Sequence, residues 1–459
     1  MIKDLTKGQP LKLITLFAIP ILIGNLFQQL FHISDILIVG RLLGVEALAA
    51  VGASAPLTFA FLVISLGFTS GLTIITAQRF GAQDKQGIKS SVFHSSVAAL
   101  LLSALISLVL IIYLRPLLKL MNVPDEIMEQ AYIFAFILGA SMILAVLYNL
   151  LSGFIRALGD SKTPLYFLIF CSLINILLNF IFIYYCKLGV AGSALGSCCS
   201  FFLTVAACIW IIVKRFPLLK ITWADCRYNH QFMIEHLRVA VPMAVQFSIL
   251  AFSMMIVQSV CNSFGTEVIA GFTAALRIEQ ISAQPLLAIG VAFATYAAQN
   301  YGAALVKRIR QGVAQSLIAC FILSLIITLS VRFYGSQMVG AFIENNDNKE
   351  QIVSIGQQYL LISSYFYFFL ACIFITRNAL QGMGRALIPL ASGVFELVIR
   401  AFAAIFLAGA IGYTGIFWAG PIAWVGGASV TAIGYWWIIT HLQPQDMRKI
   451  FTRKRQLRR

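Results

Sequence analysis

Long stretches without a charged residue constrain this chain more than any other feature of its sequence. A helix needs about 20 residues to cross the roughly 30 Å of hydrocarbon in a bilayer. Eight windows without Asp, Glu, Lys or Arg exceed that length: 47–78, 90–114, 130–155, 163–186, 188–213, 239–266, 311–331 and 351–376. Each window therefore predicts a membrane-spanning helix.

Four more spans follow from apolar segments with isolated charges or glycine breaks. Three segments carry only isolated charges: 13–39, 268–299 and 386–408. The uncharged stretch 401–445 is interrupted by Gly409, Gly412 and Gly415, which leaves one further span after them. We therefore expect an all-α polytopic membrane protein with 12 transmembrane helices. A soluble protein is excluded, because 11% of the residues are charged against about 25% in soluble domains.

The distribution of positive charge predicts the orientation of the chain. The formal net charge is +16 at pH 7, and most Lys and Arg residues lie in the N-terminal tail, in the loops after even-numbered spans and in a basic tail at 442–459. The loops after odd-numbered spans contain only Arg41, Arg115, Lys119, Lys187, Arg332 and Lys349. Because cytoplasmic loops are enriched in Lys and Arg, we expect both termini to be cytoplasmic. The tail favours membrane lipid as a partner, and nucleic acid is not expected.

The two halves of the sequence repeat each other. A shift of 221 residues aligns four pairs: Gly44 with Gly265, Glu46 with Glu267, Gln78 with Gln299, and Gly81 with Gly302. Shifts of 222 and 225 align Pro20 with Pro242 and Gly159 with Gly384. Six spans per half bring both halves into the membrane from the same side, which predicts two six-helix bundles related by pseudo-two-fold symmetry about the membrane normal. We expect an N-terminal lobe at 1–213, a cytoplasmic linker at 214–238 and a C-terminal lobe at 239–441.

Duplicated bundles of this kind favour a transporter that works by alternating access. The sequence has no Gly-x-x-x-x-Gly-Lys-Ser/Thr loop, so an ion gradient or the gradient of the substrate must supply the energy, and no cofactor is expected. The five histidines lack metal-ligand spacing and no serine stands in a Gly-x-Ser-x-Gly motif, so the sequence does not predict an enzyme. A membrane enzyme acting on lipids and a non-transporting receptor are the alternatives from other classes.

Five ionisable residues lie within the predicted spans, where a charge costs at least about 2.5–3.5 kcal/mol and marks function. They are Asp35, Arg277, Glu279, Glu396 and Arg400. Asp35 has apolar neighbours and no basic partner in its span, which suits a group that exchanges a proton or binds a cation. A carboxylate held permanently by a neighbouring helix is the alternative. Pro20 in the same span removes a helix hydrogen bond and is a candidate hinge.

Polar residues on the fifth and sixth spans are the next candidates. Asn175 and Asn179 are four apart and share one helical face, and Ser197 adds a hydroxyl on the sixth span. Two amides inside a bundle can provide oxygen ligands for a hard cation, or they can simply form hydrogen bonds between helices. The spacing does not distinguish these two interpretations.

The second half carries a possible network of charges and amides. Glu396 and Arg400 are four apart in the acid-first order that favours pairing along a helix, whereas Arg277 and Glu279 are two apart and point to different faces. Gln246, Gln280 and Gln284 are candidates to line the same region. These residues either bond only to one another and have a structural role, or they exchange protons or contact the substrate.

Three segments, in their order along the chain, resemble the multidrug and toxic compound extrusion (MATE) family of cation-coupled efflux transporters. They are DILIVGRLLG at 35–44, QRFGA at 78–82 with its echo QNYGA at 299–303, and RALGDSKTP at 156–164. With the duplication, the resemblance covers essentially the whole chain. It implies export of amphipathic or cationic organic compounds against H⁺ or Na⁺, by a monomer in the prokaryotic cytoplasmic membrane.

The resemblance also implies a cation-coupling site. In the prokaryotic members an Asp on span 1, an Asn and an Asp on span 5 and a Thr on span 6 form it, and Asp35, Asn175, Asn179 and Ser197 stand at those places. The chain departs at two of the four, since Asn179 replaces a carboxylate and Ser197 a threonine. Both ions therefore remain candidates for the coupling ion: Na⁺, bound at Asp35, Asn175 and Asn179, and the proton, which is slightly favoured.

Some members of the family carry acids on spans 7 and 10 of the second half. This chain has Gln246 on span 7 and no acid on span 10, which leaves Glu279 and Glu396 as the candidates to substitute for them. A lipid-linked saccharide flippase of the same superfamily is the alternative function. It is disfavoured because only Arg277 and Arg400 are available to bind a pyrophosphate.

Overall fold

The computed structural model describes residues 3–343, 348–445 and 447, and these residues form helices and connecting turns with no strand among them. The helices of the first half are α1 Pro10–Leu43, α2 Val45–Gly81, α3 Lys85–Leu120, α4 Asp125–Ala140, α5 Met142–Ala157, α6 Lys162–Phe180 with the π-turn η1 Ile181–Tyr185, and α7 Val190–Arg215. Two short 3₁₀ turns, η2 Pro217–Leu219 and η3 Trp223–Asp225, follow in the linker.

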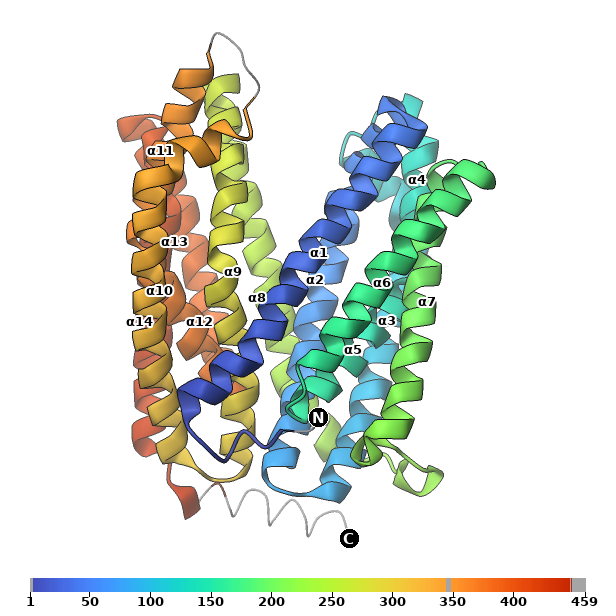
Figure 1. The fold of residues 1–459 in the computed structure, drawn as a ribbon, viewed down its shortest axis with the longest axis vertical. Coiled ribbons are helices and arrows are strands. Elements are labelled where there is room, and N and C mark those ends of the chain that lie inside the picture. Colours follow the sequence, from blue (N-terminus) through green and yellow to red (C-terminus); the bar gives the residue numbers. More distant parts are fainter. Residues whose placement is uncertain (1–2, 344–347, 446, 448–459) are drawn as a thin grey trace. The chain divides into compact units, whose positions relative to one another are not determined.

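The helices of the second half are α8 His230–Cys261 with η4 Asn262–Phe264, α9 Thr266–Gly302, α10 Val306–Gly340, α11 Lys349–Tyr365, α12 Tyr367–Gly382, α13 Leu387–Ile411 and α14 Thr414–His441 (Figure 1). Ten segments are individually long and apolar enough to span a membrane, and the bent pairs α4–α5 and α11–α12 supply one span each. The predicted all-α class and 12 spans are thereby confirmed. The basic tail expected at 442–459 lies largely outside the described residues.

The repeat extends to the two bends. The pairs α4–α5 and α11–α12 are bent by 43° and 50°. Ser141 (φ −90°, ψ 4°) and Phe366 (φ −104°, ψ 3°) form the corners, both with ψ near zero, where the α-helical hydrogen-bond ladder is interrupted. The two residues are 225 positions apart, which is the shift that aligns Gly159 with Gly384. Each half therefore bends the same span at the same place.

The chain forms two compact units that do not coincide with the two halves of the sequence. Unit 1 comprises residues 1–4 and 23–244, and unit 2 comprises residues 5–22 and 245–459. Residues 10–22 of α1 therefore belong to unit 2, and residues 230–244 of α8 belong to unit 1. In each of these helices a proline, Pro20 or Pro242, lies two residues before the point where the chain passes from one unit to the other.

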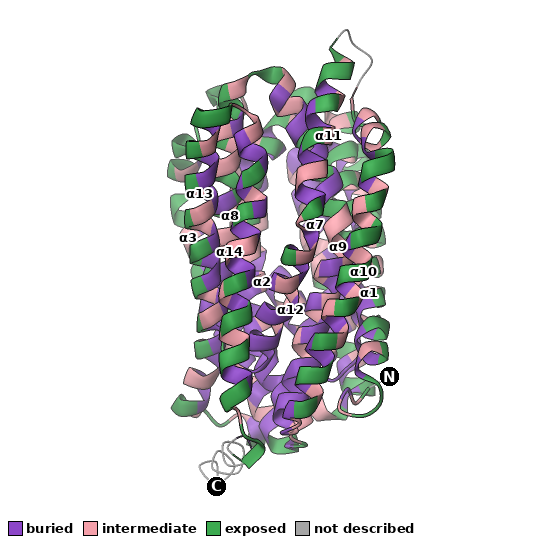
Figure 2. Ribbon diagram, turned by 90° about the vertical axis from the view of Figure 1, so that its left-hand side faces the viewer, coloured by how far each residue is buried: buried purple, intermediate pink, exposed green. Residues whose placement is uncertain are grey.

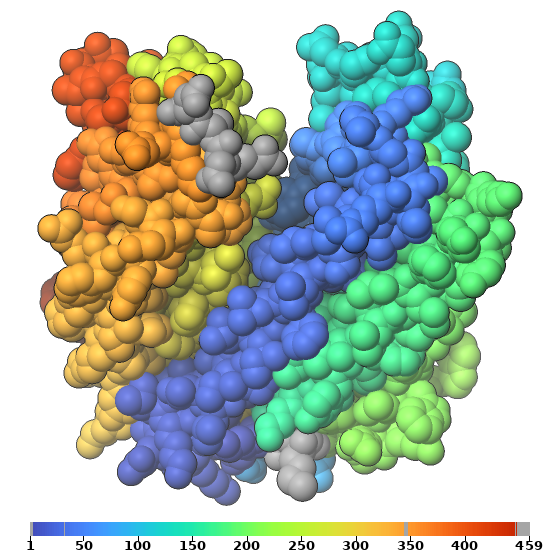
Figure 3. All heavy atoms as spheres, turned by 45° about the horizontal axis from the view of Figure 1, so that its top comes forward, coloured from blue at the N-terminus to red at the C-terminus, as the bar shows by residue number. Residues whose placement is uncertain are grey.

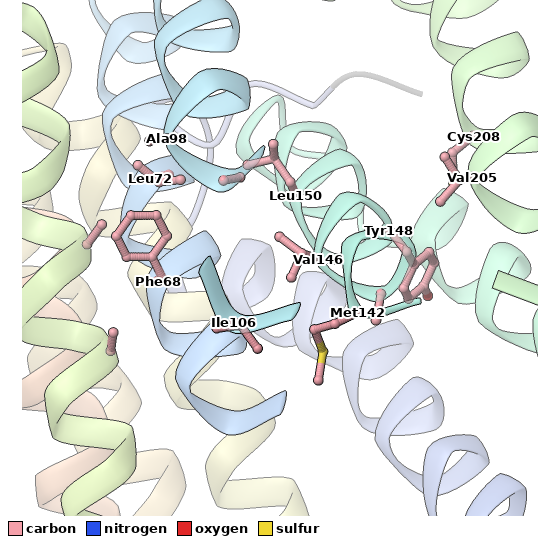
Figure 4. Packing of buried hydrophobic residues seen from close by; sticks show 14 of the residues in the cluster. Phe68, Leu72, Ala98, Ile106, Met142, Val146, Tyr148, Leu150, Val205 and Cys208 are labelled. Atoms are coloured by element: carbon pink, nitrogen blue, oxygen red, sulfur yellow. The ribbon is translucent and has the colours of Figure 1, made fainter. Parts of the chain in front are cut away.

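Each unit has its own apolar core. In unit 1, side chains such as Phe68, Leu72, Leu150 and Val205 pack together between α2, α3, α5 and α7 (Figure 4). In unit 2 the residues before and at the start of α1 pack against α9 and α12, with Leu5 and Ile14 each 1% exposed. Tight burial of this kind fixes each helix against its neighbours.

The outward faces of the helices are also apolar. On α3 four large side chains, Leu101, Leu105, Leu108 and Ile112, recur at helical spacing and are each more than half exposed. Figure 2 shows exposed positions along the outer sides of the helices and buried positions along the inner sides. An apolar exterior over long helices is stable when hydrocarbon surrounds it, so this face is the one that contacts lipid.

Candidate cation-coupling site

A chain of hydrogen bonds joins the predicted site residues in unit 1. Asn179 Nδ2 donates to Asp35 Oδ1 over 2.6 Å and to Asn175 Oδ1 over 3.2 Å, and Asn175 Nδ2 donates to Ser197 Oγ over 3.1 Å. Ser193 Oγ also donates to Asp35 Oδ1, at 3.1 Å. The structure thus brings together all four residues of the predicted set and adds a fifth.

Local sequence explains how three helices deliver these groups. The i, i+4 spacing places Asn175 and Asn179 on one face of α6, and the same spacing places Ser193 and Ser197 on one face of α7. Helix α1 runs beside α6 (Figures 1 and 3), and the hydrogen bond from Asn179 joins Asp35 of α1 to α6. The signal for Ser193 was present in the sequence, because it stands one helical turn before Ser197.

Glycine allows α7 to approach α6 closely enough for this network. A Cβ atom at Gly196 would lie 2.0 Å from Asn179 Oδ1, and one at Gly192 would lie 3.0 Å from the backbone of Phe182. The amide of Asn179 therefore occupies the space that a larger residue at 196 would fill. Asn175 and Asn179 are completely buried, while Asp35 is half-buried.

Gly196→Ala should displace Asn179 and destabilise the protein. The amide has little freedom to move away, because its nitrogen is already bonded to Asp35 and Asn175. Overpacking of this kind costs about 1–3 kcal/mol, which thermal unfolding in detergent can measure. Gly52→Ala is the matched control, since a Cβ there meets no atom within 4 Å, and Ala in an open helix is favoured over Gly by about 0.5–1 kcal/mol. Equal unfolding temperatures for the two variants would contradict the close approach.

The site contains one carboxylate surrounded by neutral oxygen and nitrogen groups. The described residues hold no cluster of three or more His, Cys, Asp and Glu side chains suited to a metal ion. Asn179 Oδ1 has no hydrogen-bond partner, although it is buried. A carboxylate with amide and hydroxyl oxygens nearby is chemically suited to a proton or to a hard monovalent cation, and unsuited to a transition metal.

The predicted pair of Glu396 with Arg400 is corrected by the structure. Glu396, on α13, forms its ion pair with Arg377 of α12 and also accepts a hydrogen bond from Ser392 Oγ at 3.1 Å. The sequence predicts a loop position for Arg377, because this residue directly follows the uncharged window 351–376. The structure continues α12 to Gly382, and Arg377 is 5% exposed.

Gln246 belongs to this first buried cluster. Its amide lies next to Gln381 at 2.9 Å, and in the orientation that satisfies Arg377 its oxygen accepts from Arg377 Nε at 2.9 Å. The cluster therefore joins α8, α12 and α13 within unit 2.

Glu279 lies in a second buried cluster. Tyr359 Oη donates to Glu279 Oε2 over 2.7 Å, and Arg400 is close enough for its charge to act on Glu279. Arg277 and Gln280 are exposed on another face of α9, and Gln284 is half-buried. The predicted second-half network is therefore two separate clusters, with Arg277 and Gln280 in neither.

Comparisons with known proteins agree over most of the chain. The sequence model of the MatE family matches residues 20–181 and 242–406. The chain is 29% identical over 388 residues to a Bacillus subtilis protein named "Probable multidrug resistance protein YpnP", covering 84% of this chain and 85% of the relative. It is 21% identical over 416 residues to "Multidrug export protein MepA" of Staphylococcus aureus, covering 89% of each.

Solved structures share the fold. A MOP superfamily transporter from Pyrococcus furiosus, whose binding pocket is described as having reverse polarity, superposes with a TM-score of 0.87 at 25% identity, over 95% of this chain and 97% of that one. A crystal structure of MATE in the bent conformation gives a TM-score of 0.87 at 25% identity, over 97% and 98% of the two chains.

Proposed function

Since the chain belongs to the MatE family and is a multi-pass membrane transporter rather than an enzyme, we propose that it is a secondary active antiporter for multidrug efflux. It exports amphipathic or cationic organic compounds from the cytoplasm and admits H⁺ or Na⁺ in exchange. The proposal includes a prokaryotic cytoplasmic membrane, two cytoplasmic termini and a monomer that needs no cofactor.

The observation that carries the proposal is the hydrogen-bond chain at Asp35. Ionised Asp35 accepts bonds from Asn179 of α6 and Ser193 of α7, so the charged carboxylate ties α1 to both helices. A proton on Asp35, or a cation beside it, changes what this oxygen can accept. The attachment of α1 then differs between the loaded and the empty state, and a transporter needs such a difference to couple two solutes.

The hinge is the second element of the proposed mechanism. Pro20 lies inside α1, where it removes one backbone hydrogen bond of the helix. A change of attachment at Asp35 bends α1 about Pro20, closes the substrate site in one orientation and opens it in the other.

The proton is the slightly favoured coupling ion. The site has a single carboxylate, and its other polar groups are neutral amides and hydroxyls. A second carboxylate would strengthen Na⁺ binding, whereas one carboxyl group is sufficient to carry a proton. The flippase alternative is not favoured, since the Bacillus subtilis and Staphylococcus aureus relatives are named as multidrug resistance and multidrug export proteins.

Transport by the reconstituted wild-type protein tests the proposal. Proteoliposomes are given either an imposed pH gradient or an imposed Na⁺ gradient, and the movement of ethidium is followed by fluorescence. We expect ethidium to move against the direction of one of the two ions, and that ion is the coupling ion. An ethidium signal that ignores both gradients, repeated with a second cationic dye, would refute ion-coupled drug export.

A further inference from the structure

The linker between α7 and α8 presents an unusual outward face. Trp223 is 95% exposed there, and Ile221 and Tyr228 are also exposed. The basic side chains Lys220 and Arg227 lie on either side of Trp223 in the sequence and are exposed as well. In a membrane protein, exposed tryptophan and tyrosine side chains are enriched at the membrane–water interface, where their rings lie at the headgroup level.

The exposure of Trp223 does not come from a loosely attached loop. Phe216 and Leu219 of the same linker are each 3% exposed and pack into the core of unit 1. The 3₁₀ turn that carries Trp223 is closed by a backbone hydrogen bond from Asp225 N to Thr222 O at 2.8 Å. The fold therefore holds this tryptophan outward while it buries two neighbouring apolar residues.

In the linker, the acidic side chain points inward and the basic side chains point outward. Asp225 is the single acidic residue between positions 214 and 229 of the sequence, and its side chain is turned inward. Its carboxylate accepts from Thr222 Oγ1 at 2.7 Å, Thr222 N at 2.9 Å, Lys89 Nζ at 3.0 Å and Gln86 Nε2 at 3.3 Å. Hydrogen bonds from Thr222 and the Lys89 ammonium lower the pKa of Asp225 to about 2, so it stays charged and satisfied. The outward face is left entirely cationic.

The end of α7 indicates that this face lies next to the membrane surface. Lys214 Nζ lies over the ring of Trp210, 4.2 Å from its centroid, on the last turns of the helix. Tryptophan and lysine pairs at the end of a spanning helix sit at the headgroup level. The linker runs over residues 216–229, directly between the end of α7 and the start of α8, so Trp223 lies on the side of the membrane where these two helix ends lie.

The geometry points to a docking surface for anionic phospholipid headgroups, formed by Trp223 with Lys220 and Arg227, on the leaflet that the linker faces. The indole inserts at the interface, where tryptophan is stabilised, and the two basic side chains bind headgroup phosphates. Each basic residue near an anionic surface contributes about fivefold to such binding. The partner is the membrane itself, and the surface is independent of the proposed transport cycle.

Quenching of Trp223 fluorescence by brominated lipid tests this surface. The full-length protein is reconstituted with a minor fraction of phospholipid brominated near the headgroup end of its chains, either anionic phosphatidylglycerol or zwitterionic phosphatidylcholine. The signal of Trp223 is the difference between the wild type and Trp223→Phe. We expect stronger quenching of this difference by the anionic lipid, and a roughly 30-fold loss of that preference in the double variant K220Q/R227Q.

A variant with the same charge removed elsewhere is the control. K162Q/K307Q neutralises two exposed lysines at the starts of α6 and α10 and should leave the preference of Trp223 unchanged. Absence of any Trp223-dependent quenching would show that the face meets water and would overturn the inference. Equal quenching by the two lipids would overturn it too. The readout needs no ion gradient, so its result stands whether or not ethidium transport is found.

Discussion

Asp35→Asn should abolish gradient-driven ethidium transport and leave the fold intact. Asparagine matches aspartate in shape, and its amide oxygen can still accept from Asn179 and Ser193, so the contacts among α1, α6 and α7 persist. The side chain can no longer carry a proton or a negative charge. We expect the coupled rate in proteoliposomes to fall at least about tenfold, to the level of passive leakage, which corresponds to a loss of about 1.4 kcal/mol or more.

Two controls make this result specific. Ser193→Ala removes one hydrogen bond to Asp35 but keeps the carboxylate, so it should reduce the rate without abolishing coupling. The elution profile and unfolding temperature of Asp35→Asn should match those of the wild type. Full gradient-driven transport by Asp35→Asn would show that Asp35 is a permanently bonded structural residue, the alternative that the sequence left open.

Arg377→Met should cause a large loss of stability in unit 2. The carboxylate of Glu396 is 3% exposed, and without Arg377 it retains a hydrogen bond from Ser392 alone among the contacts described for it. Gly427 provides the space it occupies, since a Cβ there would lie 2.5 Å from Glu396 Oε1. Leaving one partner of a buried ion pair uncompensated costs about 3–5 kcal/mol, so the unfolding temperature in detergent should drop clearly.

The double variant R377M/E396Q separates a structural from a functional role. It removes both charges, so most of the lost stability should return. If the pair is a structural clamp, transport by the double variant returns with stability. Recovery of stability without recovery of transport would assign a titrating or substrate-facing role to Glu396. An unchanged unfolding temperature for Arg377→Met would contradict the buried pair itself.

The membrane fold was predictable because burial in hydrocarbon acts on whole segments. Uncharged windows longer than 20 residues located the spans, and the shift between halves located the repeat. The bends at Ser141 and Phe366 were not predictable, because no proline lies near either corner and their conformation depends on packing against neighbouring helices. A hydropathy pattern shows how long an apolar segment is, but it does not show where the helix formed by that segment bends.

The two candidate sites differ in how much of them the sequence contained. The i, i+4 spacing within α6 grouped Asn175 with Asn179, which is a local property, and the resemblance to the MATE family joined this pair to Asp35 and Ser197. The partner of Glu396 depends on which charged residue the neighbouring helix delivers. Arg377 stands at the edge of an uncharged window, where its sequence context resembles that of a loop cation, and only the tertiary packing of α12 against α13 identifies it.

Because residues 5–22 belong to unit 2, the chain cannot be cut at the linker into two complete units. Leu5 is held by its backbone there, with its N–H donating to Gln299 and its carbonyl accepting from Asn300. A shift of 222 carries 5–22 onto 227–244, the segment that the second half places in unit 1. A gene cut at the linker would encode two fragments that each lack a piece carried by the other. A half of this kind made as a separate chain would complete itself only by exchanging that segment with a second copy, as in a domain-swapped dimer.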